Sequence, residues 1–158
     1  MLFRNNLAKM AFSSQAKLAA STFRAADLTV TPRLAPKPKP GWGEFLFGEH
    51  YTDHMLAVDW SKEGGWEAPQ ILENGPITVE TSATSLHYGI SCYESLSIVK
   101  NSKTGKLQGF RTQDHLQNLQ DSTSHLDLPG FDSDELLGCL KELVKVDRNW
   151  FEFNNEID

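Results

Sequence analysis

From Gly43 onward, apolar and polar side chains alternate in short runs that end at glycine or proline, a pattern typical of half-buried β-strands. The stretch GEFLFGEHYTDHMLAVDW predicts two short strands around a turn at Gly48, and ILENGPITVE predicts a further strand after Asn74-Gly75-Pro76. The hydroxyl-rich stretch before Leu86 predicts a short helix that begins near residues 82–84. The run SLSIVKNSKTGKLQGF predicts a β-hairpin, because it alternates into a polar turn and out again.

After residue 111 the apolar residues recur every three or four positions, which is the spacing of helices. In the first predicted helix, Thr112 or Asp114 is the expected N-cap and Pro129-Gly130 the stop. In the second, Asp132 and Glu135 form an approximate capping box. The apolar positions at three- and four-residue spacing are Leu116, Leu119, Leu126, Leu136, Leu137, Leu140, Leu143 and Val144. Strands followed by helices predict an α+β domain, with two helices on one face of a mainly antiparallel sheet.

The amino-terminal residues differ from the rest in charge. Residues 1–26 contain four cations and no acid, and all 21 acidic residues follow from Asp27 onward. Apolar side chains opposite the cations are typical of a mitochondrial presequence, which we assign to residues 1–30; a disordered basic tail on a cytoplasmic protein is the alternative. The proline-rich residues 31–43 are predicted to be an extended linker, and residues 44–158 the folded domain.

Charge and composition narrow the functional classes. The 158 residues carry a formal net charge of −6 and are 39% hydrophobic, which is typical of one globular domain. A protein that binds nucleic acid or an acidic membrane needs a contiguous basic patch, and none follows residue 40. No apolar run is long enough to span a membrane. Cys92 and Cys139 lie far apart without a CxxC spacing, so neither a disulfide framework nor a zinc site is indicated.

Two groups of side chains have candidate chemistry. His50 and His54 are four residues apart, but a strand context and the lack of a third ligand favour hydrogen-bonding histidines over a metal site. Phe47, Tyr88 and Tyr93 come from separate segments that a small domain can bring together. They are compatible with an apolar ligand pocket, but the residues by themselves favour packing in the core.

Three stretches of the sequence resemble a known family. FGEHYTDHMLAVDWSKEGGWEAPQI, SLHYGISCYESL and GFRTQDHLQNLQDSTSHLDLP, in that order, resemble the amino-terminal domain of branched-chain amino acid aminotransferases of fold type IV. The resemblance covers roughly residues 40–150. It implies pyridoxal phosphate as cofactor, transfer of the amino group of leucine, isoleucine or valine to 2-oxoglutarate, and a homodimer in full-length relatives.

The resemblance also implies roles for particular residues. Phe47, Tyr88 and Tyr93 match positions that line the pocket for the branched side chain. Asn118 stands where the family has the arginine that holds the cofactor phosphate. An amide lacks the charge and the paired donors of a guanidinium, so this site is expected to be degenerate. Ser95 replaces a family glycine, and strain is expected if that position needs a positive φ.

The lysine that binds the cofactor belongs, in the family, to a carboxy-terminal domain that this sequence does not contain. We therefore assign no catalytic residue here. The resemblance favours a truncated and inactive branched-chain transaminase. A non-catalytic binding or assembly subunit derived from the same domain is the alternative hypothesis.

Overall fold

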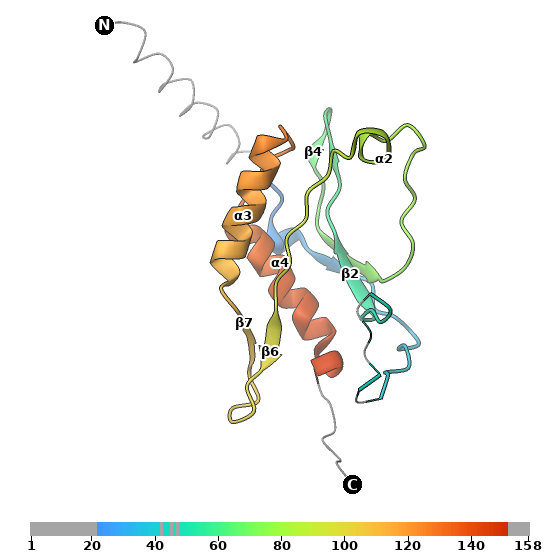
Figure 1. Cartoon of the computed structure of the whole chain (residues 1–158), viewed down its shortest axis with the longest axis vertical. Coiled ribbons are helices and arrows are strands. Elements are labelled where there is room, and N and C mark those ends of the chain that lie inside the picture. The colour runs from blue at the N-terminus through green and yellow to red at the C-terminus, as the bar shows by residue number, and fades with distance from the viewer. Residues whose placement is uncertain (1–21, 42, 45, 47, 152–158) are drawn as a thin grey trace, which may run out of the picture.

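The computed structural model describes residues 22–41, 43–44, 46 and 48–151 (Figure 1). The strands are β1 (Thr29–Val30), β2 (His54–Ala57), β3 (Trp60–Ser61), β4 (Gly65–Trp66), β5 (Gln70–Glu73), β6 (Ile98–Lys100) and β7 (Leu107–Gly109). The helices are η1 (Ala25–Asp27), α2 (Thr84–Tyr88), α3 (Thr112–His125), α4 (Ser133–Val146) and η2 (Arg148–Phe151). The predicted α+β class is confirmed.

The main sheet has the order β1-β5-β2, with β5 parallel to β1 and antiparallel to β2. Ile71 on β5 pairs with Leu56 on β2, and its side chain is completely buried. Helix α4 packs beside β2, and α3 packs on α4 (Figure 1). The segments β3–β4 and β6–β7 form separate antiparallel hairpins, the second at the predicted place.

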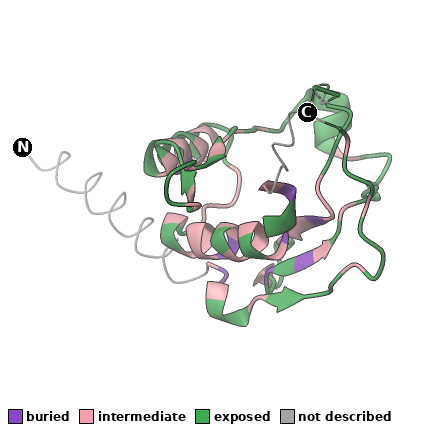
Figure 2. Cartoon of the chain, turned by 90° about the horizontal axis from the view of Figure 1, so that it is seen from below, coloured by how far each residue is buried: buried purple, intermediate pink, exposed green. Residues whose placement is uncertain are grey.

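The buried residues gather around α4 and the adjoining strands (Figure 2). The buried apolar side chains among the described residues are Phe23, Ile71, Leu116, Cys139 and Trp150. Burial raises the pKa of the Cys139 thiol, so this cysteine is a packing residue and not a nucleophile. No helix of the described residues has the length and apolar character needed to cross a membrane.

Helix α4 begins as predicted at Asp132, whose Oδ1 accepts the N–H groups of Asp134 (2.8 Å) and Glu135 (3.2 Å). Glu135 does not close the predicted capping box in return. Its Oε2 instead accepts the backbone N–H of Ala25 at 2.6 Å, because η1 packs on the start of α4. This close approach requires a glycine, since a Cβ on Gly138 would lie 2.7 Å from the Ala25 Cβ.

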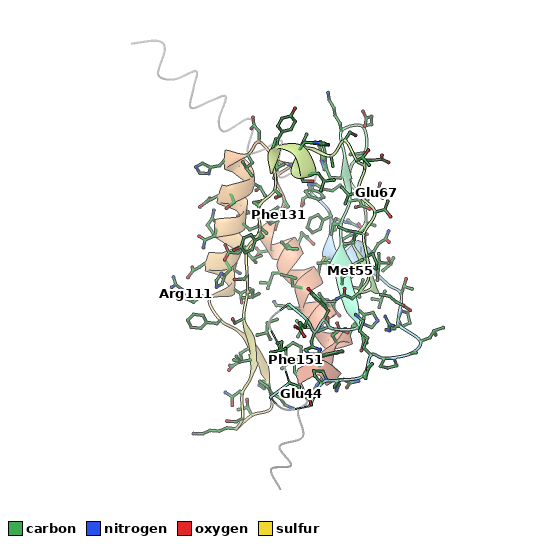
Figure 3. The ribbon with its side chains drawn as sticks, turned by 45° about the vertical axis from the view of Figure 1, so that its right-hand side comes forward. Glu44, Met55, Glu67, Arg111, Phe131 and Phe151 are labelled. Atoms are coloured by element: carbon green, nitrogen blue, oxygen red, sulfur yellow. The ribbon has the colours of Figure 1, made fainter. Side chains whose placement is uncertain are left out.

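The N-cap predicted for α3 at Thr112 or Asp114 is wrong. Arg111 occupies that position in the left-handed conformation, with φ 48° and ψ 40°, and no side chain caps the helix. Its Nε donates to Asp114 Oδ2 at 2.6 Å, which diverts the expected capping carboxylate (Figure 3). At the other end, Asp127 has φ 53°, and the N–H of Leu128 donates to Thr123 O in a Schellman-type turn.

The folded domain begins earlier than residue 44. Phe23 is buried and its ring packs edge-on against Trp66, with ring centroids 5.4 Å apart. Strand β1 joins the main sheet, so residues 22–30 are part of the fold despite their assignment to a presequence. The expected linker 31–43 is also fixed in part, because the backbone N–H of Lys37 donates to Asp53 Oδ1. Residues 1–21 lie outside the described part of the chain.

One strand is displaced from its predicted place. The strand expected after Asn74-Gly75-Pro76 precedes these residues as β5, whereas Ile77 and Val79 lie in an exposed irregular segment. The N–H of Asn74 donates to Asp53 O at 2.8 Å, which ends the ladder with β2. Pro76 has no N–H to continue it. Phe45 and Phe47, the apolar positions of another expected strand, lie outside the described residues.

Candidate functional site

His54 and Asp147 form a buried pair, with side-chain exposures of 8% and 4%. The His54 Nδ1 lies 2.6 Å from Asp147 Oδ1, and the His54 backbone N–H donates to Asp147 Oδ2 at 3.1 Å. The Arg33 N–H donates to His54 Nε2 at 2.9 Å, so the ring proton lies on Nδ1 and is donated to Asp147. Both ring nitrogens are engaged, which makes His54 a structural residue and not a metal ligand.

Asp53 extends the same cluster. Its carboxylate accepts the Lys37 N–H at 2.7 Å and the Trp150 indole N–H at 2.8 Å. Burial alone raises the pKa of Asp53, but these hydrogen bonds and the nearby charge of Arg33 together outweigh it and lower the pKa. We call this cluster the TDH latch, after the sequence Thr52-Asp53-His54, because it ties the amino-terminal segment and the end of α4 to the start of β2. Its members are Arg33, Lys37, Asp53, His54, Asp147 and Trp150.

The role of Asp147 could hardly be predicted from the sequence. It is one of many acids in the second half of the chain, and its partner His54 is 93 residues away. The one local signal is its place directly after the apolar stretch of α4, where an acid gains nothing from the helix dipole. Among the described residues no group of three or more His, Cys, Asp or Glu side chains is placed to hold a metal ion.

Asn118 lies on α3 beside an open hollow. One wall is the extended segment 90–97, which contributes Cys92 and Glu94. The other wall is α3 itself, and it contributes Asn118, Asp121, Ser122, His125 and Leu126. The Glu94 Oε1 lies 2.6 Å from His115 Nδ1 and holds the segment against the helix. Asn118 therefore faces a concave surface.

The residues of this hollow do not fit the phosphate group of pyridoxal phosphate. Glu94 and Asp121 both carry carboxylates, and neither a lysine nor an arginine is among the lining residues. The available donors are the Asn118 amide, the Ser122 hydroxyl and the His125 ring, whose Nδ1 is already 2.7 Å from Asp121 O. A phosphate needs compensating positive charge, and the two acids add negative charge instead.

The two predicted pocket residues that the structure describes, Tyr88 and Tyr93, do not line this hollow. Tyr88 ends α2 and Tyr93 lies in the extended segment, and their exposed fractions are 78% and 88%. In that segment Cys92, Glu94 and Leu96 face inward, whereas Tyr93 and its alternate neighbours face solvent. Neither tyrosine lines the Asn118 hollow. Phe47 lies outside the described residues.

The expected strain at Ser95 does not arise. Within the described residues, the only non-glycine positions with positive φ are Arg111 and Asp127. Ser95 belongs to the extended segment and points outward, so a side chain is accommodated there without backbone cost.

Comparison with known proteins agrees with the resemblance. The chain is 36% identical over 135 residues to the cytosolic branched-chain-amino-acid aminotransferase of Mus musculus, covering 85% of this chain and 35% of that protein. It is 36% identical over 131 residues to the mitochondrial form of Rattus norvegicus, covering 82% and 33%. A probable branched-chain-amino-acid aminotransferase of Staphylococcus aureus (strain N315) matches 121 residues at 36% identity, covering 77% and 33%. No protein-family model matches the chain.

These relatives come from animals and a bacterium, and each is 36% identical to this chain over the matched residues. The chain therefore belongs to the branched-chain-amino-acid aminotransferase family. The match spans about a third of the length of these relatives. Both cytosolic and mitochondrial proteins are among them.

Proposed function

We propose that this chain serves as the amino-terminal part of a branched-chain amino acid transaminase, which moves an amino group between leucine, isoleucine or valine and 2-oxoglutarate. The observation that carries the proposal is the 36% identity over 135 residues to a branched-chain-amino-acid aminotransferase. In this proposal Phe47, Tyr88 and Tyr93 contribute to the wall of the side-chain pocket. The exposure of Tyr88 and Tyr93 is consistent with that role, because the wall of a pocket must be accessible to the ligand.

We further propose that the chain neither retains pyridoxal phosphate nor transaminates by itself. The support is the charge of the Asn118 hollow, where Glu94 and Asp121 stand and no lysine or arginine is found. The lysines of turns and of the helix face are not expected to attach the cofactor, and the structure shows each of them exposed to solvent. They are Lys62, Lys100, Lys103, Lys106, Lys141 and Lys145. None of them lines the hollow.

A chimera tests the two parts of the proposal separately. Residues 22–151 replace the matching stretch of the mouse cytosolic relative, and transfer from leucine to 2-oxoglutarate is measured against pyridoxal phosphate concentration. We expect activity with a raised cofactor requirement, and Asn118→Arg is expected to lower that requirement. Gln113→Arg is the matched control, because Gln113 is also an exposed residue of α3 but does not line the hollow. An inactive chimera that folds refutes the family role, whereas equal effects of the two arginines refute the phosphate argument.

A non-catalytic binding or assembly subunit is the second candidate. It is favoured by the exposure of Tyr88, Ile90 and Tyr93, which follow one another closely in the sequence, because exposed apolar groups often mark an interface. Light scattering of the purified chain tests this role. Self-association that Tyr88→Ser and Tyr93→Ser abolish supports it, and a monomer at all concentrations argues against a surface that pairs with itself.

We also propose that the basic residues at the amino terminus direct mitochondrial import. The absence of acids before Asp27 supports this, and a disordered tail on a cytoplasmic protein is the alternative. Import of the tagged chain into isolated mitochondria is expected to require Arg4 and Lys9. Unchanged import of an Arg4→Glu, Lys9→Glu variant would exclude the presequence.

A further inference from the structure

A second concave surface lies between the β6–β7 hairpin and α4, away from Asn118. It is a groove with a volume of about 550 Å³, within the range of small-molecule sites. The hairpin side contributes Leu96, Ile98 and Leu107, and α4 contributes Leu137, Leu140 and Val144. These six side chains give the groove an apolar floor.

Four cationic residues also line the groove. Lys106 comes from the hairpin, and Lys141, Lys145 and Arg148 come from the last turns of α4 and the residues after it. Figure 1 shows the hairpin tip and the carboxyl end of α4 at the same end of the molecule. No aspartate or glutamate lines the groove, although the chain has a net charge of −6. The groove and the Asn118 hollow therefore have opposite charge.

The helix dipole explains some of these cations but not all. Positive side chains near the carboxyl end of a helix are favourable in any protein, and Lys145 is already paired with Glu142 at 2.6 Å. Lys106 is on the hairpin, where this explanation does not apply. Within the described part of the chain, neither Lys106 nor Lys141 forms an ion pair through its side chain. These two lysines face the groove from opposite sides.

We propose that this groove binds a straight-chain aliphatic carboxylate. The hydrocarbon tail lies on the leucine, isoleucine and valine floor, where burial removes its surface from water. The carboxylate pairs with Lys106 and Lys141. A single anionic head matches the unpaired lysines among the lining residues of an otherwise largely apolar groove. The site is separate from the proposed transaminase role and does not depend on it.

Titration calorimetry of the 158-residue chain with dodecanoate, below its micellar concentration, tests the proposal. We expect saturable binding of one molecule, weakened about fivefold by Lys106→Gln and again by Lys141→Gln. Lys103→Gln is the matched control, since Lys103 is on the same hairpin but does not line the groove. Dodecyltrimethylammonium, which has the same tail and a cationic head, is expected to bind far more weakly.

Three results would overturn the proposal. The first is absence of saturable binding to a chain that circular dichroism shows to be folded. The second is equal affinity for the two head groups, which would indicate adsorption of the tail alone. The third is loss of binding in Tyr93→Ser, because Tyr93 is exposed and does not line the groove.

Discussion

Replacing Asp147 with asparagine tests whether the TDH latch stabilises the fold. The carboxylate of Asp147 accepts two donors, the His54 ring Nδ1–H and the His54 backbone N–H. An asparagine of nearly the same shape has one oxygen, so it can satisfy one donor and turns its own amide toward the other. A buried donor without a partner costs about 1–3 kcal/mol. Asp147→Ala leaves both donors unpaired and is expected to cost about 2–6 kcal/mol.

Urea unfolding followed by tryptophan fluorescence measures these differences. Because total stabilities of about 5–15 kcal/mol are usual, a loss of this size moves the midpoint clearly while the slope stays constant. Asp114→Asn is the control, since Asp114 also accepts a 2.6 Å hydrogen bond but is exposed, and its effect is expected to stay within about 0.5 kcal/mol. Equal midpoints for Asp147→Asn and the control would refute the assignment of a stabilising role to the buried pair.

Three other features of the fold give further predictions. The pKa of Asp53 is lowered in the folded state, so its contribution to the free energy of unfolding is fully present above the unfolded pKa of about 3.9 and is lost as the pH falls through the folded pKa. Trp150→Phe removes one of the hydrogen bonds to Asp53 and should therefore make the urea midpoint fall less steeply at acid pH. An unchanged pH profile contradicts this. Gly138→Ala should lower the free energy of unfolding in urea by about 1–3 kcal/mol, because the added Cβ meets the Ala25 Cβ. Ala25→Gly in the same chain should restore the stability, and lack of rescue would place the strain elsewhere. Asp127→Gly should raise the melting temperature, with a gain of about 1 kcal/mol, since φ 53° suits glycine; a lower melting temperature contradicts the argument.

The sequence predicted α3 and α4 well because their apolar positions repeat over several turns and their ends have local signals. Asp132 caps α4 as expected, and Pro129-Gly130 follows the end of α3. The start of α3 could not be predicted, because Arg111 takes a left-handed conformation that the sequence does not mark. Local signals thus located the helices but not every cap.

The amino-terminal segment shows why the domain boundary was misplaced. Phe23 was counted as part of an amphipathic presequence, and an apolar residue on such a segment looks the same as one that packs in a core. Its partner Trp66 lies more than forty residues away. The bond from Ala25 to Glu135 spans 110 residues. Contacts between residues so far apart produce no repeating pattern in a single sequence, so they could not be predicted from it.

The candidate site was predicted in part. Resemblance to the family marked Asn118, and the structure places it beside a hollow. The acids Glu94 and Asp121 that share this hollow come from the facing segment and from the next turn of α3, so their joint effect depends on the fold. The pocket roles of Phe47, Tyr88 and Tyr93 stay predictions.

The central claim is that this member of the aminotransferase family does not hold the cofactor phosphate through its own Asn118 hollow. Titration calorimetry of the purified chain with pyridoxal phosphate, with inorganic phosphate as a second ligand, tests it most directly. We predict no saturable binding of either ligand, and binding of both in a variant that combines Asn118→Arg with Asp121→Asn. Saturable binding to the unaltered chain, lost in Asn118→Ala and kept in Gln117→Ala, would contradict the account.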